Sequence, residues 1–122
     1  MQIQVKIIAL AAAGVLTLAA LAGPESKSPG AQAFEKRCGG CHGADQAIEG
    51  PPLRGVFNRK AGESRGFPYS DALKSSGLRW TAPNLDKWLT DPSTLVPNTD
   101  MAFRLNDAAE RERIIGYLKQ LR

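Results

Sequence analysis

Apolar residues recur with a helical period in several stretches of the chain, most clearly near the C-terminus. Four of them stand at i, i+1, i+4 and i+7, on one face of a helix: Ile114, Ile115, Leu118 and Leu121. Asp107 is a suitable N-cap, because its side chain can accept a hydrogen bond from a backbone N–H of the first turn. We therefore predict a final helix that begins near Asp107 and buries one face.

A second helical face lies in the first half of the chain. Phe34, Cys38 and Cys41 stand at i, i+4 and i+7, a spacing that places all three side chains on one side of a helix. We predict that this helix opens at Ser28 or Gly30. A phenyl ring and two thiols then share its apolar face.

Two shorter helical segments are predicted between these two. Residues 69–75 can form about two turns before Gly77 ends them. Thr81 is a suitable N-cap for a helix that runs through Trp88 and stops before Pro92. The chain therefore has two main helices at its ends and a third between them.

Two long stretches show neither a helical nor a strand period. Residues 43–66 carry several glycines and prolines at spacings typical of loops, and residues 95–105 are also predicted to be loop. A loop of the first length counts against a core built from side chains alone, whereas wrapping around a flat cofactor would explain it. The predicted fold class is all-α, a small single domain with three main helices, short helical turns and long loops.

A Cys-x-x-Cys-His run occupies residues 38–42, a pattern typical of a c-type haem attachment site. Cys38 and Cys41 stand at i and i+3 and His42 at i+4, so the three side chains share one helical face. Two thiols at this separation can add to neighbouring vinyl groups of one porphyrin, and the imidazole can then reach the iron. We predict one covalently attached haem c.

Three other interpretations of this run compete with haem attachment. A thioredoxin-like redox pair would need a βαβ context and has no use for the adjoining histidine. A zinc site needs four ligands, and the chain has only two cysteines and one histidine. A structural disulfide between Cys38 and Cys41 would leave His42 without a role.

The scarcity of two residue types narrows the choice of iron ligands. His42 is the only histidine, and Met101 is the only methionine apart from Met1. Ligation by a histidine and a methionine raises the potential of haem iron and suits electron carriage. The alternative for Met101 is an ordinary core methionine, but we favour ligation.

The N-terminal stretch has the pattern of a secretory signal. Lys6 precedes an uncharged apolar run, and Ala20 and Ala22 fit a small-x-small cleavage site. We predict that residues 1–22 are a cleaved signal peptide, residues 23–29 a short linker and residues 30–122 the haem domain, located in a bacterial periplasm. The alternative is an uncleaved anchor that holds the domain at the membrane, facing the periplasm; cleavage would leave no stable membrane insertion.

Four motifs cover nearly the whole of the predicted haem domain. They are FEKRCGGCH at residues 34–42, GPPLRG at 50–55, GFPYSDA at 66–72 and PNTDMAF at 97–103. With them the chain resembles class I cytochrome c of the soluble mitochondrial and bacterial type. The resemblance implies helices and loops wrapped around covalent haem, with His42 and Met101 as the axial iron ligands. It also implies that the first and last helices cross near Gly30.

The same resemblance assigns roles to further residues of the haem pocket. It gives the carbonyl of Pro51 as the acceptor for the second N–H of the ligating histidine, a partner that such an imidazole usually has. The implied donors to the haem propionates are Arg59, Tyr69 and Trp80, and Thr99 is implied to hydrogen-bond a propionate or an internal water. Leu53 and Trp88 are implied to line the pocket as well.

Two positions depart from the pattern of the family inside the pocket. Trp88 stands where many relatives have a tyrosine hydroxyl near the methionine sulfur, and an indole can only donate a hydrogen bond. Leu73 replaces a frequent asparagine. We therefore expect a drier pocket with altered hydrogen bonding near the sulfur.

A third departure concerns the surface around the haem edge. Ser93, Thr94 and Asp100 lie where mitochondrial members carry docking lysines, whereas Arg37 and Arg104 can supply part of a basic rim. The formal net charge is +4, but no motif for nucleic-acid binding accompanies the scattered basic residues. We expect a modest basic rim around an apolar contact and no nucleic-acid partner.

The predicted function is that of a soluble one-electron carrier, not an enzyme. Its expected partners are redox proteins, namely a membrane oxidase, a reductase complex or a dehydrogenase, and the chain is expected to be a monomer. One alternative is a haem subunit or dedicated electron acceptor of a periplasmic dehydrogenase. Another, in the enzyme class, is a haem peroxidase or gas sensor in which Met101 leaves the iron open.

Overall fold

The computed structural model describes residues 25–122, and the predicted signal peptide lies outside them. The helices of this part are α1 (Pro29–Arg37), α2 (Asp71–Ser75), α3 (Ala82–Thr90), α4 (Pro92–Leu95) and α5 (Ala108–Gln120). Isolated bridges are its only β-type pairings. The all-α prediction is confirmed, with α1, α3 and α5 as the three main helices. None of these helices is long and apolar enough to cross a membrane.

Side-chain caps explain where the main helices begin. Ser28 accepts from the N–H of Ala31 at 3.2 Å, and the Asp107 carboxylate accepts from the N–H of Glu110 at 2.9 Å. The predicted starts of the first and last helices are thus confirmed, with Ser28 rather than Gly30 as the first cap. Thr81 caps α3 as predicted.

Two of the sequence predictions for the shorter segments were wrong in detail. The helix predicted over residues 69–75 starts only at Asp71, because Ser70 serves as its N-cap. Leu95 was predicted to begin a loop but is the last residue of α4. This four-residue helix is too short to show a period, and the Asp91 side chain that caps it provides its start signal.

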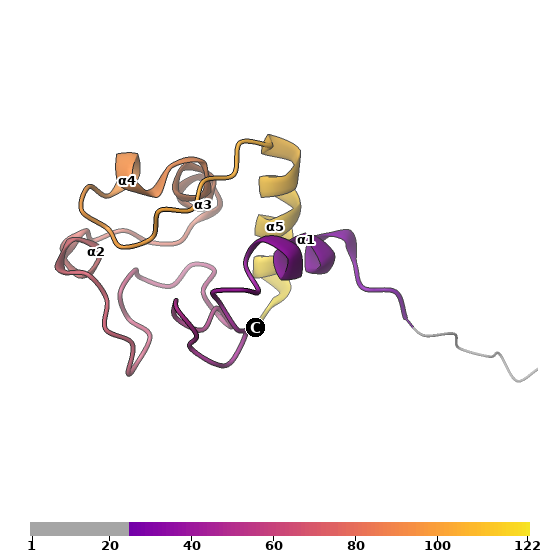
Figure 1. The fold of residues 1–122 in the computed structure, drawn as a ribbon, viewed down its shortest axis with the longest axis horizontal. Helices are drawn as coiled ribbons and strands as arrows, with labels where there is room; N and C mark the ends of the chain where they lie inside the picture. The colour runs from indigo at the N-terminus through magenta and orange to yellow at the C-terminus, as the bar shows by residue number, and fades with distance from the viewer. Residues whose placement is uncertain (1–24) are drawn as a thin grey trace, which may run out of the picture.

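Helices α1 and α5 cross at close range, as Figure 1 shows for the indigo and yellow ribbons. A Cβ atom on Gly30 would lie 2.6 Å from the carbonyl oxygen of Arg113 and 3.0 Å from Cβ of Tyr117. The rings of Phe34 and Tyr117 pack with their centroids 5.1 Å apart. The crossing near Gly30 is confirmed, since only a residue without a side chain permits this backbone approach.

An ion pair joins the same two helices at the end of α1. The Arg37 guanidinium donates to both Glu110 carboxylate oxygens, at 2.8 Å and 3.0 Å. This bidentate contact raises the pKa of Arg37 and lowers the pKa of Glu110. It fixes the residue that immediately precedes the Cys-x-x-Cys-His run.

The core lies between the helices and the long loops. Helix α3 packs against both α4 and α5, and α2 lies on the far side of the molecule from α1 (Figure 1). Residues 43–66 form no helix, as predicted. The buried apolar residues come from both the helices and the loops: Phe34, Val56, Ala61, Leu73, Trp80, Leu85, Trp88, Leu89, Val96, Leu105, Ile114, Ile115, Leu118 and Leu121.

Candidate haem site

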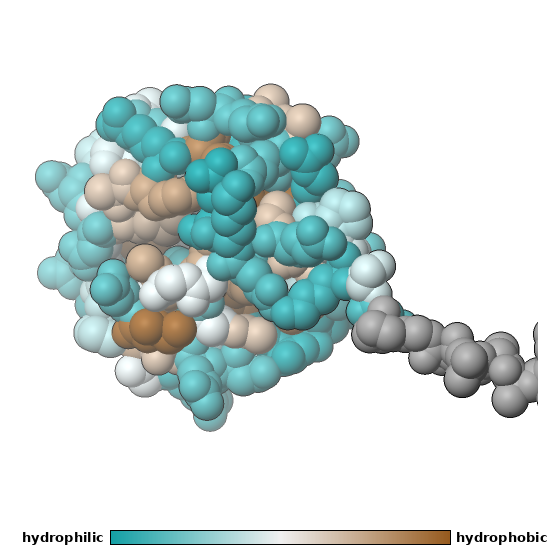
Figure 2. Space-filling view, turned by 45° about the vertical axis from the view of Figure 1, so that its right-hand side comes forward, coloured by the Kyte–Doolittle hydropathy of each residue, from teal (hydrophilic) through white to brown (hydrophobic). Residues whose placement is uncertain are grey.

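A cavity of about 670 Å³ opens between the helices and the loops. This volume is within the range of cofactor sites. Every residue that the sequence pointed to as a cofactor or iron contact lines it: Cys38, Cys41, His42, Pro51, Leu53, Arg59, Tyr69, Trp80, Trp88, Thr99 and Met101. Figure 2 shows apolar side chains gathered on one face of the molecule within a hydrophilic surround.

The Cys-x-x-Cys-His run forms a turn directly after α1, not the last turn of the helix itself. Cys38 is the C-cap, and its carbonyl accepts from the N–H of Cys41 at 3.0 Å and of His42 at 2.8 Å. These bonds keep the helical spacing of the three side chains beyond the end of the helix. The shared face predicted from their spacing therefore survives, and all three side chains line the cavity.

Both cysteines are free thiols and not a disulfide. Burial raises the pKa of the Cys38 thiol to about 11. The pKa of Cys41 is also raised, because its thiol donates to the Glu49 carboxylate, with Sγ 3.5 Å from the oxygen.

The ring of His42 is held in one orientation by the loop that follows it. Nδ1–H donates to the carbonyl oxygen of Pro51 at 2.8 Å, as the resemblance implied. A carbonyl can only accept, so the proton must lie on Nδ1 and the lone pair of Nε2 is left for a metal. This arrangement is the usual one for a histidine ligand.

Gly50 makes this approach of loop and ring possible. A Cβ on Gly50 would lie 2.3 Å from Cε1 and 2.6 Å from Nδ1 of His42, far inside van der Waals contact. The N–H of Gly50 also donates to the carbonyl of Cys41 at 2.8 Å. The loop therefore contacts the imidazole ring at a position where a side chain would collide with it.

Helices α2 and α3, the segment before α3 and the loop after α4 bring apolar and aromatic groups to the cavity. Trp80 and Trp88 are buried and meet edge to face, with their ring centroids 5.0 Å apart. Met101 is half-buried and lines the cavity together with them. Leu73, which stands where relatives often have an asparagine, is also buried and lines the cavity.

Hydrogen-bond donors lie along the same cavity. Arg59 donates to the carbonyl of Arg54 at 3.2 Å and of Pro52 at 3.5 Å, which holds its guanidinium in place. The hydroxyl of Tyr69 accepts from the N–H of Ser64 at 3.2 Å, so its own proton is available for another acceptor. These donors match the needs of an anionic group that is partly buried.

Sequence reasoning missed several residues at the cavity. Ile48, Glu49 and Phe103 line it, and Ile48 is 55% exposed. The signal for Ile48 and Glu49 was their place directly before the glycine and proline of the GPPLRG motif. Nothing in the local pattern distinguished an exposed isoleucine there from a buried one.

The charges around the cavity differ from the expected basic rim. Arg37 is paired with Glu110, and Arg104 lies 3.1 Å from Asp91. The pKa of Asp91 is lowered, first by a hydrogen bond from the Thr94 hydroxyl. Both arginines that were expected to form a rim are therefore compensated by carboxylates.

These features together fit a covalently attached haem. The cavity has apolar and aromatic walls for a flat macrocycle, and donors for its carboxylates. It also has two thiols at the correct spacing and an oriented imidazole. The residues present therefore suit haem c.

Comparison with known proteins points to one family. The family model for cytochrome c matches residues 28–122. Among curated proteins, cytochrome c2 of Rhodoblastus acidophilus is 44% identical over 91 residues, which cover 70% of this chain and 84% of that protein.

Solved structures give the same result for the fold. Cytochrome cH from Methylobacterium extorquens superposes with a TM-score of 0.71 at 44% identity, over 75% of this chain and 94% of that one. The ferricytochrome c2 from Rhodopseudomonas palustris also has a TM-score of 0.71, at 36% identity, over 76% of this chain and 96% of its own.

Proposed function

Since the chain belongs to the cytochrome c family, we propose that His42 and Met101 are the two axial ligands of its haem iron. The chain is an electron-transfer protein of the class I cytochrome c type, not an enzyme, and the family carries one covalently attached haem c. When bound, this group supplies an iron that changes between the ferric and ferrous states without making or breaking bonds.

The observation that carries the ligand assignment is the meeting of two scarce residues in one cavity. His42 is the only histidine of the sequence and Met101 its only methionine besides the initiator. They come from opposite halves of the chain, and both line the same apolar space. The Pro51 carbonyl leaves Nε2 of His42 free to bind a metal.

The remaining contacts are proposed to attach and orient the cofactor. Cys38 and Cys41 are proposed to form the two thioethers. Arg59, Tyr69 and the Trp80 indole N–H are proposed as donors to the propionates. Their positions on the cavity wall and the bonds that hold Arg59 support these roles.

Three further side chains complete the proposed contacts. Thr99 lies two residues before Met101 on the cavity wall and is proposed to donate to a propionate or a nearby water. Leu53 and Trp88 are proposed to pack against the macrocycle. The indole N–H of Trp88 can donate a hydrogen bond but the ring offers no acceptor, so it cannot accept a hydrogen bond near the sulfur.

A thioether in the sixth position favours electron carriage over ligand chemistry. Met101 would occupy the place at which oxygen, peroxide or another small molecule must bind. A haem peroxidase or gas sensor would need that place to be open. The His/Met pair also raises the iron potential, which suits a carrier.

Substitution of Met101 tests this proposal. Met101→Leu keeps the volume of the side chain but removes the sulfur, so packing should change little. We expect loss of the sulfur-to-iron charge-transfer band of the ferric protein, a lower potential and new binding of cyanide or imidazole.

The matched control is Leu85→Ala, which removes apolar bulk from the same cavity but no sulfur. It should keep the charge-transfer band. If the band and the potential of Met101→Leu equal those of the wild type, another group holds the sixth position and the assignment is wrong.

Export and the domain boundaries remain part of the proposal. We propose that residues 1–22 are a signal peptide removed on export to the periplasm. Residues 23–29 are then a short linker, and residues 30–122 form the haem domain. The apolar run, the small residues at its end and the start of α1 at Pro29 support these boundaries. Intact-mass measurement on the native protein checks the cleavage, and a full-length chain would contradict it.

The partner is proposed to be a redox complex that docks over the apolar mouth of the cavity. Ile48 is 55% exposed there, and Glu49 and Asp100 are exposed carboxylates that also line the cavity. Arg37 and Arg104 are paired, so they offer little net positive charge. We propose that apolar contact dominates this docking face and that the modest basic rim expected around it is weakened by these two ion pairs.

A further inference from the structure

Arg111 is a buried cation that the electron-transfer site itself does not use. It lies in the first half of α5 with 9% of its surface exposed and is the buried charged residue of the part that the structure describes. A charge in such a place is unfavourable unless it is paired and hydrogen-bonded. The hydrogen-bond partners of Arg111 therefore indicate which segments of the chain this side chain stabilises.

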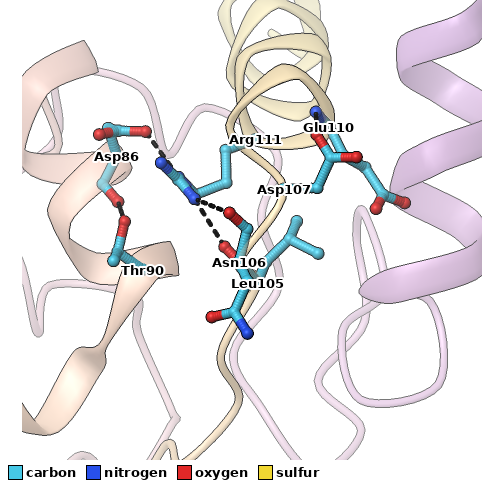
Figure 3. A network of polar contacts seen from close by, with 7 residues as sticks. All are labelled: Asp86, Thr90, Leu105, Asn106, Asp107, Glu110 and Arg111. Carbon is cyan, nitrogen blue, oxygen red and sulfur yellow. Dashed lines mark hydrogen bonds and ion pairs between the residues drawn. The ribbon is translucent and has the colours of Figure 1, made fainter.

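The guanidinium joins three segments of the chain, as Figure 3 shows. Nε donates to the Asp86 carboxylate of α3 at 2.7 Å. Nη1 donates to the carbonyl oxygen of Leu105 at 2.8 Å and to that of Asn106 at 3.0 Å. One side chain thus links α5, α3 and the end of the loop that carries Met101.

Leu105 is held at both of its backbone groups. Its carbonyl accepts from Arg111, and its N–H donates to the carbonyl of Leu89 in α3 at 2.8 Å. Its side chain is 4% exposed. The chain is therefore pinned against α3 four residues after Met101, and Leu89 itself lines the cavity.

The Met101 loop has few bonds of its own. Within residues 97–104 the only backbone hydrogen bond is from the N–H of Thr99 to the carbonyl of Val96, at 3.2 Å. The ion pair of Arg104 with Asp91 is largely solvent-exposed, and such pairs contribute little. Val96 is buried at the other end of the loop. The hydrogen bonds that hold this loop therefore lie mainly at its two ends, while Met101 and Phe103 between them pack against the core.

We propose that Arg111 is a positioning residue for Met101: its guanidinium fixes the end of the loop to the α3 wall of the cavity and so holds the thioether at the iron. The proposal rests on the ligand role of Met101 proposed above. A planar guanidinium serves three acceptors in fixed directions, which a lysine ammonium on a flexible stem does not reproduce.

A simpler role for Arg111 would be to join α5 to α3 without affecting the loop. The two roles differ in what they change. Loss of a helix-to-helix contact lowers the stability of the whole fold. Loss of the loop anchor also makes Met101 easier to displace while the fold is intact.

Competition by imidazole measures this displacement, because external imidazole can bind the ferric iron only when Met101 leaves it. We would titrate haem-loaded Arg111→Gln and Arg111→Lys, well below their unfolding temperatures, and follow the sulfur-to-iron band. Urea unfolding of each variant gives the stability separately. Arg113→Gln is the matched control, since Arg113 lies on the exposed side of the same helix.

We expect the association constant of imidazole to rise about tenfold in Arg111→Gln, equivalent to about 1.4 kcal/mol. Arg111→Lys should show a smaller rise, and Arg113→Gln none. A constant equal to that of the wild type, with only urea stability reduced, would overturn the proposal.

Asp86→Asn keeps the test decisive if neither Arg111 variant accumulates. It leaves both carbonyl bonds of Arg111 but removes the carboxylate that orients the guanidinium, so the imidazole constant should rise by a smaller factor. An unchanged constant would overturn the proposal. Failure of the ligand assignment is distinguishable, because Met101→Leu would then bind imidazole no more tightly than the wild type.

Discussion

Single residues without a side chain decide how closely the loop approaches the imidazole. Gly50 is in contact with the His42 ring, and the next residue, Pro51, supplies the acceptor for Nδ1–H. The orientation of the ligand therefore depends on a backbone segment and not on a neighbouring side chain. A side chain at position 50 would therefore disturb the orientation of the His42 ring.

We predict that Gly50→Ala displaces either the His42 ring or the loop, because the new Cβ would lie 2.3 Å from Cε1. The bond from Nδ1–H to Pro51 should weaken, and the potential and the yield of haem-loaded protein should fall. Spectroscopic titration of the potential and the haem-to-protein ratio measure both effects.

Gly40→Ala is the control for this substitution. Gly40 lies inside the Cys-x-x-Cys-His run, but a Cβ there would meet nothing within 4 Å. It should load haem as the wild type does. Equal potentials and equal haem loading for Gly50→Ala and the wild type would contradict this prediction. They would mean that the loop shifts to accept the methyl group without moving the His42 ring.

At the scale of elements, the crossing of α1 and α5 positions the start of the site. Gly30, the Phe34–Tyr117 contact and the Arg37–Glu110 ion pair lie along this crossing. Cys38 follows at once, so any shift of α1 against α5 moves the first thiol. The packing of two helices far apart in the sequence thus determines where the cofactor attaches.

We predict that Gly30→Ala lowers the free energy of unfolding by about 1–2 kcal/mol, as overpacking of a close contact does. The added methyl would lie 2.6 Å from the Arg113 carbonyl, and the helix preference of alanine should offset only part of the strain. Urea unfolding of the haem-loaded protein gives the value.

Gly116→Ala offers the opposite case on the partner helix. A Cβ on Gly116 meets nothing within 4 Å, so this variant should gain up to about 1 kcal/mol from helix preference alone. If Gly30→Ala and Gly116→Ala both stabilised the protein, α1 and α5 could move apart at no cost in unfolding free energy. That result would contradict the tight crossing.

At the scale of the whole molecule, the cavity is the centre around which the fold is organised. Buried residues of the helices and of the loops form the core, and several of them, including Leu85 and Ile114, also line the cavity. A chain of this size has a small core of its own, so a covalently held apolar cofactor completes it. Stability and function therefore depend on the same space.

The charge around the mouth of the cavity sets how a partner finds the molecule. Because Arg37 and Arg104 are compensated, we predict that electron transfer to the native partner depends only weakly on ionic strength, changing about twofold or less between low and physiological salt. Oxidation of reduced, haem-loaded protein by membranes of the native host, across a salt series, measures this.

The double variant Glu49→Gln, Asp100→Asn removes two exposed carboxylates at the mouth and should make the salt dependence steeper. A steep fall of the wild-type rate with salt would indicate a basic docking rim and would contradict the prediction of a compensated surface.

The sequence by itself determined whatever depends on spacing over a few residues. The caps Ser28, Thr81 and Asp107 lie where predicted, because a cap and the N–H that it accepts are near neighbours in the chain. The haem motif and the scarcity of histidine and methionine likewise needed no structure. Helix α4 escaped prediction because four residues are too few to show a period.

Only the tertiary structure decided what residues distant in the sequence do to one another. The pairing of Arg37 with Glu110 and of Arg104 with Asp91 is visible only in the fold, and so are the contacts of Arg111 on which the proposed anchor of the Met101 loop rests. An arginine in the sequence carries the same charge whether it is exposed or paired. Its partner is set by how helices and loops pack, and that packing leaves no local period to detect.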